Sequence, residues 1–180
     1  MSQLDMDLLK TVKRLAITAM ISDDILMETF IFKGGSAIDM IYGGNNRASL
    51  DLDFSMEKGL SEEEEKDIAK KIEETLKDTF MEEGFVAHAI KFDRRPRNMA
   101  DEVKDFWGGF QIKFKVIPLE KAKEVKFDPQ RLAHYSLAVG KRNSTIFKID
   151  ISSYEYCAAK ALEDFEDYTI QVYTPEMMGL

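Results

Sequence analysis

The chain contains very little cysteine or histidine: its 180 residues include one cysteine, Cys157, and two histidines, His88 and His134. A single cysteine excludes an internal disulfide framework and suits a reducing cytoplasm. So few soft ligands also exclude a histidine–cysteine metal site. Any metal bound here is therefore expected to have oxygen ligands, and Mg²⁺ is the natural candidate.

Long apolar runs are also missing from the sequence. No stretch approaches the ~20 residues that cross a bilayer, and the N-terminus has neither the apolar region nor the cleavage site of a signal peptide. Repeats, low-complexity segments and interdomain linkers are not found either. An apolar content of 44% is typical of a globular chain. We therefore expect one cytoplasmic domain over residues 1–180, without membrane contact.

Positive charge is scarce overall, and it is unevenly distributed. The net charge is −8, yet residues 91–148 hold 14 Lys/Arg against seven Asp/Glu, a local balance of +7. This asymmetry leaves room for one basic face on an acidic protein. The other interpretation is that the lysines only decorate exposed strand faces.

Hydrophobic periodicity predicts an alternation of helices and strands. Helices are predicted at Leu4–Met20, Ala37–Tyr42, Ser61–Met81 and Asp128–Ala138. Strands are predicted at Thr29–Phe32, Leu50–Phe54, Phe85–Phe92, Gly109–Pro118, Ser144–Ser152 and Tyr168–Tyr173. Shorter features are a helical turn capped by Ser22–Asp24, a basic loop at Arg94–Asn98 and a helix start at Thr174–Glu176. The pattern indicates an α+β fold in which a mixed sheet is flanked by helices.

The most informative stretch is Phe32–Met56, where Gly34-Gly35-Ser36 stands at a strand-to-helix junction and an alternating acidic strand follows. Backbone N–H groups and a hydroxyl at such a junction bind phosphate well. Asp51 and Asp53 share one strand face about 7 Å apart and can converge on a hard cation. Each half of this pattern has a plainer interpretation: the glycines as an ordinary turn, and the aspartates as a solvated strand face. Their order and separation favour phosphoryl or nucleotidyl transfer.

The residues FKGGSAIDMIY, followed by RASLDLDF, resemble the AbiEii/AbiGii toxin family of nucleotidyltransferases, in the DNA polymerase β-like superfamily. The family pattern is a lysine-Gly-Gly-Ser/Thr element and then Arg-x-Ser-x-Asp-x-Asp-Phe. The resemblance extends more loosely over most of the chain. It implies a polymerase-β-like fold, with a mixed, mostly antiparallel sheet flanked by helices.

The resemblance also implies the roles of individual residues. Asp51 and Asp53 would bind Mg²⁺ that bridges a nucleoside triphosphate, and a third carboxylate would come from a later strand. Asp150, between Ile149 and Ile151, is the best-placed candidate and would complete a site for two Mg²⁺ ions. The phosphate-binding residues implied are Gly34, Gly35, Ser36, Arg47 and Ser49.

Three of the basic and hydroxyl residues have alternatives. Arg47 either pairs with a phosphate or forms a salt bridge that fixes the loop. Ser49 is expected to brace the turn. Lys160 imitates a functional lysine of the family, but we expect it in a loop between Asp150 and the strand at Tyr168, without a functional role.

The function implied is that of a toxin in a toxin–antitoxin or phage-abortive-infection system, with an antitoxin encoded nearby. It would transfer a nucleoside monophosphate from a nucleoside triphosphate to RNA, tRNA in some relatives. One alternative is an enzyme that transfers the nucleotide to a small molecule such as an aminoglycoside. Another is a non-catalytic module that binds nucleotide or protein. The basic residues 91–148 favour a nucleic-acid acceptor.

The resemblance further implies a helical half beyond Leu180, which carries a functional lysine and aspartate. We therefore expect the 180 residues to be an incomplete, weakly active part of an enzyme, with Tyr173, Met177 and Met178 on an exposed apolar face.

Overall fold

The computed structural model describes residues 3–43, 51–96, 108–139, 143–155 and 160–178. Its helices are α1 (Gln3–Ile21), α2 (Asp24–Thr29), α3 (Gly34–Ile41), α4 (Glu62–Glu82), α6 (Leu119–Glu124) and α7 (Pro129–His134). Its strands are β1 (Ile31–Lys33), β2 (Leu52–Ser55), β3 (Phe85–Arg95), β4 (Gly109–Pro118), β5 (Phe147–Ser152), β6 (Lys160–Phe165) and β7 (Tyr168–Tyr173).

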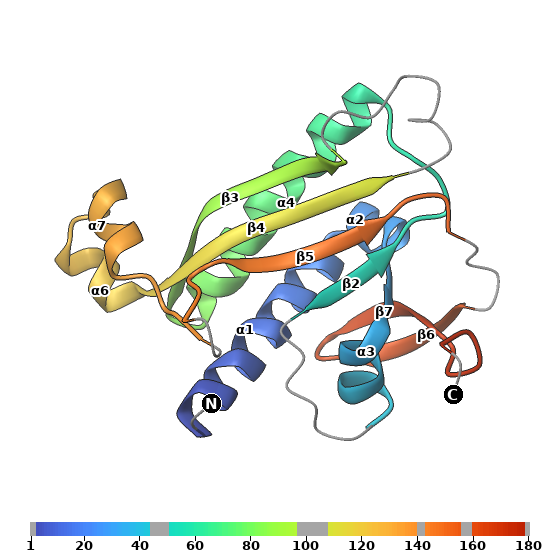
Figure 1. Cartoon of the computed structure of the whole chain (residues 1–180), viewed down its shortest axis with the longest axis horizontal. Coiled ribbons are helices and arrows are strands. Elements are labelled where there is room, and N and C mark those ends of the chain that lie inside the picture. The colour runs from blue at the N-terminus through green and yellow to red at the C-terminus, as the bar shows by residue number, and fades with distance from the viewer. Residues whose placement is uncertain (1–2, 44–50, 97–107, 140–142, 156–159, 179–180) are drawn as a thin grey trace.

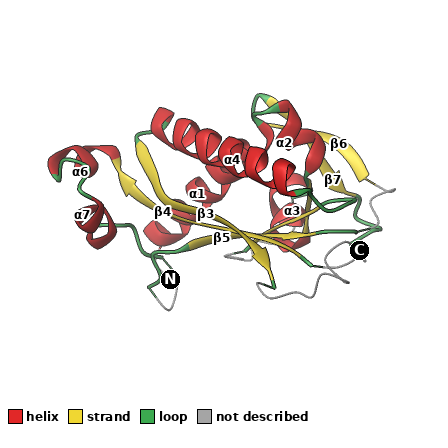
Figure 2. Ribbon diagram, turned by 90° about the horizontal axis from the view of Figure 1, so that it is seen from above, coloured by secondary structure: helices red, strands yellow, loops and turns green. Residues whose placement is uncertain are grey.

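The strands of this described part form a seven-stranded sheet in the order β3-β4-β5-β2-β1-β7-β6. Neighbours pair antiparallel, except that β2 with β5 and β1 with β7 are parallel. The chain is therefore an α+β protein with a mixed, mostly antiparallel sheet, as predicted. Helices α1, α2 and α4 lie along one face of the sheet (Figures 1 and 2).

The main core lies between that sheet face and α1 and α4. Along α4, Ile68, Ile72, Leu76 and Phe80 recur at helical spacing and are all buried, while the acidic first turn stays exposed. A capping box between Ser61 and Glu64 begins this helix. Along β4, buried Phe110, Ile112, Phe114 and Val116 alternate with polar residues. Three phenylalanine rings pack together in this main core. The ring centroid of Phe54 lies 5.1 Å from that of Phe32 and 6.3 Å from that of Phe30.

The other face of β3, β4 and β5, which we call the open face, is covered by described helices only at the end where β3 begins and β4 ends. There α6 and α7 close over a second, smaller core of Val86, Ile117, Ala122, Val125 and Leu132. The Ser136 hydroxyl, just after α7, donates to the Leu132 carbonyl at 2.8 Å. His88 on β3 therefore donates from Nε2 to the Ser136 oxygen, 2.9 Å away. Figure 1 looks onto this face, with α6 and α7 beyond the ends of β3 and β4.

A bulge in β3 decides which of its residues face outward. His88 pairs with Lys115, but the next pair is Lys91 with Lys113, so the register slips by one residue. Ala89, in the bulge, has a positive φ of 52°. Beyond the slip, Lys91, Asp93 and Arg95 stand on the open face and Phe92 stacks on buried Phe110 at 4.7 Å.

Several element predictions are confirmed, and others are wrong. Gly109–Pro118 and Tyr168–Tyr173 are strands as predicted, and Asp23 caps α2. The strand predicted at Thr29–Phe32 begins only at Ile31, because the cap at Asp23 starts a helix that extends through Thr29. Lys160 begins strand β6 and does not lie in a loop. Helix α6 was not predicted.

The glycine motif and the C-terminal residues also differ from expectation. Gly34-Gly35-Ser36 does not precede a helix but forms the first turn of α3. Residues 175–178 form a turn and not a helix, with the Met178 amide donating to the Thr174 carbonyl at 3.3 Å. Tyr173 is only 6% exposed, because it packs with Ile31, Met177 and Met178 in a small cluster. The expectation of an exposed apolar face at Tyr173 is therefore wrong.

Replacing Ile72 with Ala should lower the free energy of unfolding by about 2–5 kcal/mol, because it opens a cavity between α4 and the sheet. Ile72 is fully buried. Chemical denaturation measures the change, and Lys70→Ala on the exposed side of the same helix should stay within about 0.5 kcal/mol. Equal losses in both variants would contradict the packing described.

Candidate functional site

Two carboxylates from distant parts of the chain stand side by side on the open face. Asp53 on β2 is the direct register partner of Asp150 on β5, and neighbouring strands lie about 4.8 Å apart. Burial raises the pKa of Asp53 above its ordinary value, and the negative charges of Asp150 and Asp51 raise it further. Lys33 opposes this shift in the pKa of Asp53. The negative charges of Asp51 and Asp150 therefore both act on the Asp53 carboxylate.

Gly34 lets the start of α3 approach the Asp53 carboxylate closely. A Cβ on Gly34 would lie 3.0 Å from Asp53 Oδ2, and the φ of Gly34 is +84°, a conformation that favours glycine. Lys33 is the N-cap residue of helix α3, and its side chain forms no capping hydrogen bond with the helix. Gly35 is exposed, and a Cβ there would meet nothing within 4 Å. The helix start is therefore open to a ligand beside Asp53.

Ser36 is turned into the protein in this structure. Its side chain is 1% exposed, and its hydroxyl donates to the Asp51 backbone carbonyl at 2.7 Å. The bond ties α3 to the residue that precedes β2. This is a structural role, and phosphate binding by Ser36 stays a prediction.

A hydrogen-bonded chain of side chains orients Asp150. Arg95 Nη2 donates to Gln111 Oε1 at 2.7 Å, and Gln111 Nε2 donates to Asp150 Oδ1 at 2.8 Å. Gln111 and Asp150 are direct register partners, whereas Arg95 pairs with Gly109 and reaches Gln111 diagonally across the sheet face. One oxygen of Asp150 is thereby fixed toward Gln111, which positions the carboxylate beside Asp53.

Arg95 and Gln111 were not among the predicted site residues. The alternation of β4 places Gln111 on the face opposite the core, but only the register of three strands shows that it meets Asp150. Lys33, at the end of β1, pairs with Glu155 at 3.2 Å and stands opposite Asp53.

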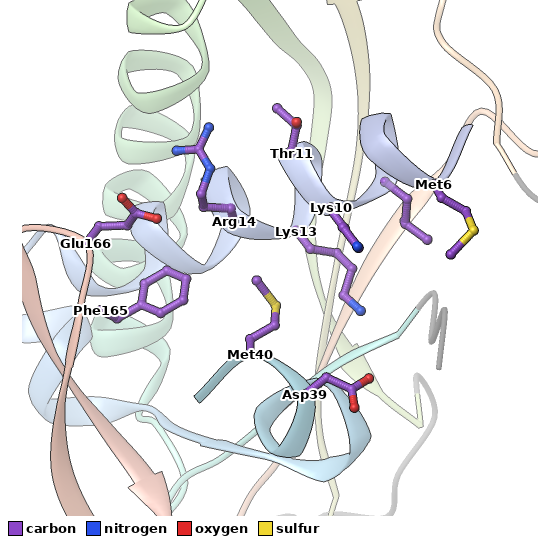
Figure 3. A pocket seen from close by; sticks show the side chains of 10 residues that line it. Met6, Lys10, Thr11, Lys13, Arg14, Asp39, Met40, Phe165 and Glu166 are labelled. Atoms are coloured by element: carbon purple, nitrogen blue, oxygen red, sulfur yellow. The ribbon is translucent and has the colours of Figure 1, made fainter. Parts of the chain in front are cut away.

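A pocket of about 440 Å³ lies between α1, α3 and the end of β6. Lys13 of α1 and Asp39 of α3 extend toward one another across it (Figure 3). Lys13 is only 7% exposed. Burial lowers the pKa of Lys13, and the charges of Asp39 and Asp51 oppose that shift. The charge of this buried cation therefore interacts with the charges of both Asp39 and Asp51.

The donor set suits a magnesium ion that shares its coordination with a substrate. Among residues that the structure describes, no three Asp, Glu, His or Cys side chains are grouped to hold a metal. Mg²⁺ often takes only one or two carboxylates and completes its octahedron with waters and phosphates. Asp53 and Asp150 fit that requirement. Arg47 and Ser49 lie outside the described residues, so their predicted roles stay predictions.

The described geometry defines an α+β protein with a carboxylate pair beside an open helix start. A family model, "Nucleotidyl transferase AbiEii toxin, Type IV TA system", matches residues 16–178. The chain belongs to this AbiEii family, whose members are nucleotidyl transferase toxins of type IV toxin–antitoxin systems. No curated protein matches it. Within the described residues, every helix is too short or too polar to cross a membrane.

Gly34→Ala should reduce stability by about 1–2 kcal/mol, the cost of a left-handed conformation for an L-residue. The added methyl group would also press on Asp53. Gly35→Ala is the matched control and should be neutral, or stabilising by up to about 1 kcal/mol, because it adds helix propensity in open space. Thermal melting compares the two, and a more costly change at Gly35 would refute the close approach.

Asp53→Asn should raise the Tm of the metal-free protein at neutral pH, because it removes a charge that burial and neighbouring carboxylates disfavour. The pKa of Asp53 is raised in the folded state, so the charged carboxylate lowers the free energy of unfolding by its full amount only above that raised pKa. This destabilisation disappears as the pH falls below the ordinary pKa of an aspartate, where the carboxyl is protonated in both states. In EDTA, the Tm of Asp53→Asn should therefore differ from that of the wild type at about pH 7 and equal it at about pH 3. Asp164→Asn, at an exposed position on β6, is the control, and a lower Tm for Asp53→Asn at pH 7 would oppose this account.

Proposed function

We propose that this protein is a metal-dependent nucleotidyltransferase, the toxin of a type IV toxin–antitoxin pair, which transfers a nucleoside monophosphate from a nucleoside triphosphate to RNA. The observation that carries the proposal is the register of Asp53 with Asp150 beside the open start of α3. Family membership supports the transferase class. The partner expected from that membership is an antitoxin.

The order of elements supports a polymerase-β-like fold for this domain. Strand β1 leads into α3 through Gly34, the antiparallel β2 carries Asp53, and Asp150 arrives on a later parallel strand. This is the arrangement that the family resemblance implies. In this arrangement the first turn of α3, for which we propose phosphate binding, adjoins the strands that carry Asp53 and Asp150.

The triphosphate would lie over the first turn of α3. The first N–H groups of a helix have no partner within it, and the helix dipole favours negative charge there. Gly35 leaves this turn unobstructed, and Gly34 brings it next to Asp53. Asp53 and Asp150 would hold Mg²⁺, with Asp51 two residues before Asp53, and the ion would supply charge neutralisation for the phosphates and the leaving group.

In the transfer step, the oxygen of the acceptor hydroxyl attacks the α-phosphorus of the nucleotide. The bond from that phosphorus to the bridging oxygen breaks, and pyrophosphate leaves with the electron pair. The hydroxyl proton passes to a carboxylate, for which Asp150 is positioned through Gln111. Holding nucleotide and acceptor together can contribute about 7–11 kcal/mol to such a reaction.

Nucleotide binding and transfer test the proposal together. Titration calorimetry with each nucleoside triphosphate should detect binding with Mg²⁺ and lose it in EDTA. With Mg²⁺, transfer of the α-³²P label to RNA should fall on the order of 100- to 1,000-fold in Asp53→Asn and Asp150→Asn. Asp164→Asn should match the wild type. Binding that survives both EDTA and Asp53→Asn would refute the metal-bridged site.

A further inference from the structure

The open sheet face next to the carboxylates carries four lysines. Lys113 of β4 pairs with Lys91 of β3 on one side and with Lys148 of β5 on the other. These three stand in one row across adjacent strands, about 10 Å from end to end by the strand spacing. Lys115 lies two residues farther along β4, toward α7. We call Lys91, Lys113, Lys115 and Lys148 the lysine face.

The bulge in β3 is what completes this row. Without the slip between His88 and Lys91, Ile90 would stand opposite Lys113, and Phe92 would face outward. The inserted residue brings Lys91 to the open face and keeps Phe92 packed beside Phe110. Bulges are recurrent devices for re-aiming side chains next to functional sites.

The lysine face adjoins the reactive carboxylates directly. The pair Gln111–Asp150 lies two residues along from the pair Lys113–Lys148, a distance of about 7 Å. Asp53 continues that row on β2. A chain of negative charges lying over the lysines would therefore end at Asp53 and Asp150.

The row concentrates positive charge across three adjacent strands. Like charges directly opposite on neighbouring strands repel. In a chain of net charge −8, acidic side chains are abundant, yet two successive cross-strand pairs of β3, β4 and β5 join lysine to lysine. A polyanion lying across the row would complement this concentrated positive charge.

We propose that the lysine face binds the phosphodiester backbone of single-stranded RNA and leads its free end to Asp53 and Asp150. The proposal deepens the proposed function and rests on it for the role of the bound RNA. Among described residues of the face, none is a Phe, Tyr or Trp on which a base could stack. Contacts to phosphates alone do not read sequence, so binding is independent of base identity.

Fluorescence anisotropy with labelled A-only and U-only RNA of about 12 nucleotides measures this binding without nucleotide or Mg²⁺. Both RNAs should bind the wild type within about twofold of each other. In the variant Lys91→Gln/Lys113→Gln/Lys148→Gln, the slope of log affinity against log salt should become shallower by about 2, since each single-strand phosphate contact contributes about 0.7. The control Lys66→Gln/Lys70→Gln/Lys77→Gln removes the same charge from exposed positions on α4 and should keep the wild-type slope.

The single variants Lys91→Gln and Lys148→Gln change exposed side chains and keep the test valid if the triple variant is unstable. Each should reduce the slope by about 0.7. The proposal is overturned if the wild type binds neither RNA at low salt, if the lysine-face variants keep the wild-type slope, or if the α4 control loses as much. It is also overturned if one RNA binds more than tenfold tighter than the other.

Titration of the same variants with nucleoside triphosphate and Mg²⁺ separates this proposal from the proposed function. The lysine-face variants should bind nucleotide as the wild type does. RNA binding without nucleotide binding would refute the transferase and leave the lysine face standing as an RNA surface. Nucleotide binding without RNA binding would refute the lysine face alone.

Discussion

The parallel pairing of β2 with β5 is the constraint on which the site depends. Leu52 and Phe54 pair with Ile149 and Ile151, and all four side chains are buried in the core. Because side chains alternate between the two faces, the same register sends Asp53 and Asp150 outward together. A slip of one residue would bury a carboxylate and expose the apolar set, which the core does not tolerate. Hydrophobic burial thus holds two like charges next to each other.

The surroundings of Asp53 concentrate features that an ordinary surface avoids. Its carboxylate has acidic neighbours, a glycine in a left-handed conformation beside it and a helix start with no side-chain cap. Each of these opposes stability by itself, and the ring cluster of Phe30, Phe32 and Phe54 behind β2 offsets them. Local departures of this kind, supported by a well-packed core, are typical of functional sites.

The sequence predicts the parts of the fold that follow from local periodicity. The alternation of Gly109–Pro118 and the acidic strand around Asp53 give both the strands and their buried faces. It does not reveal cross-strand registers, so Gln111 and Arg95 could not be connected to Asp150. Strand β6 was missed because it is an edge strand with a mostly exposed, charged sequence, in which only Phe165 is buried. Gly34-Gly35-Ser36 reads as a turn, and only the structure shows that it is the helix start itself.

The small core under α6 and α7 also has a consequence for how the protein moves. It is separate from the main core, and bonds from His88 to Ser136 and from the Leu137 amide to the Val116 carbonyl connect the segment around α7 to β3 and β4. Such a unit opens at a lower free energy than the whole domain. Burial and the charge of Lys115 lower the pKa of His88, so protonation of this histidine in acid opposes the closed state. Hydrogen exchange should therefore proceed in two tiers, with the α6–α7 amides opening while the sheet that holds the carboxylates stays closed.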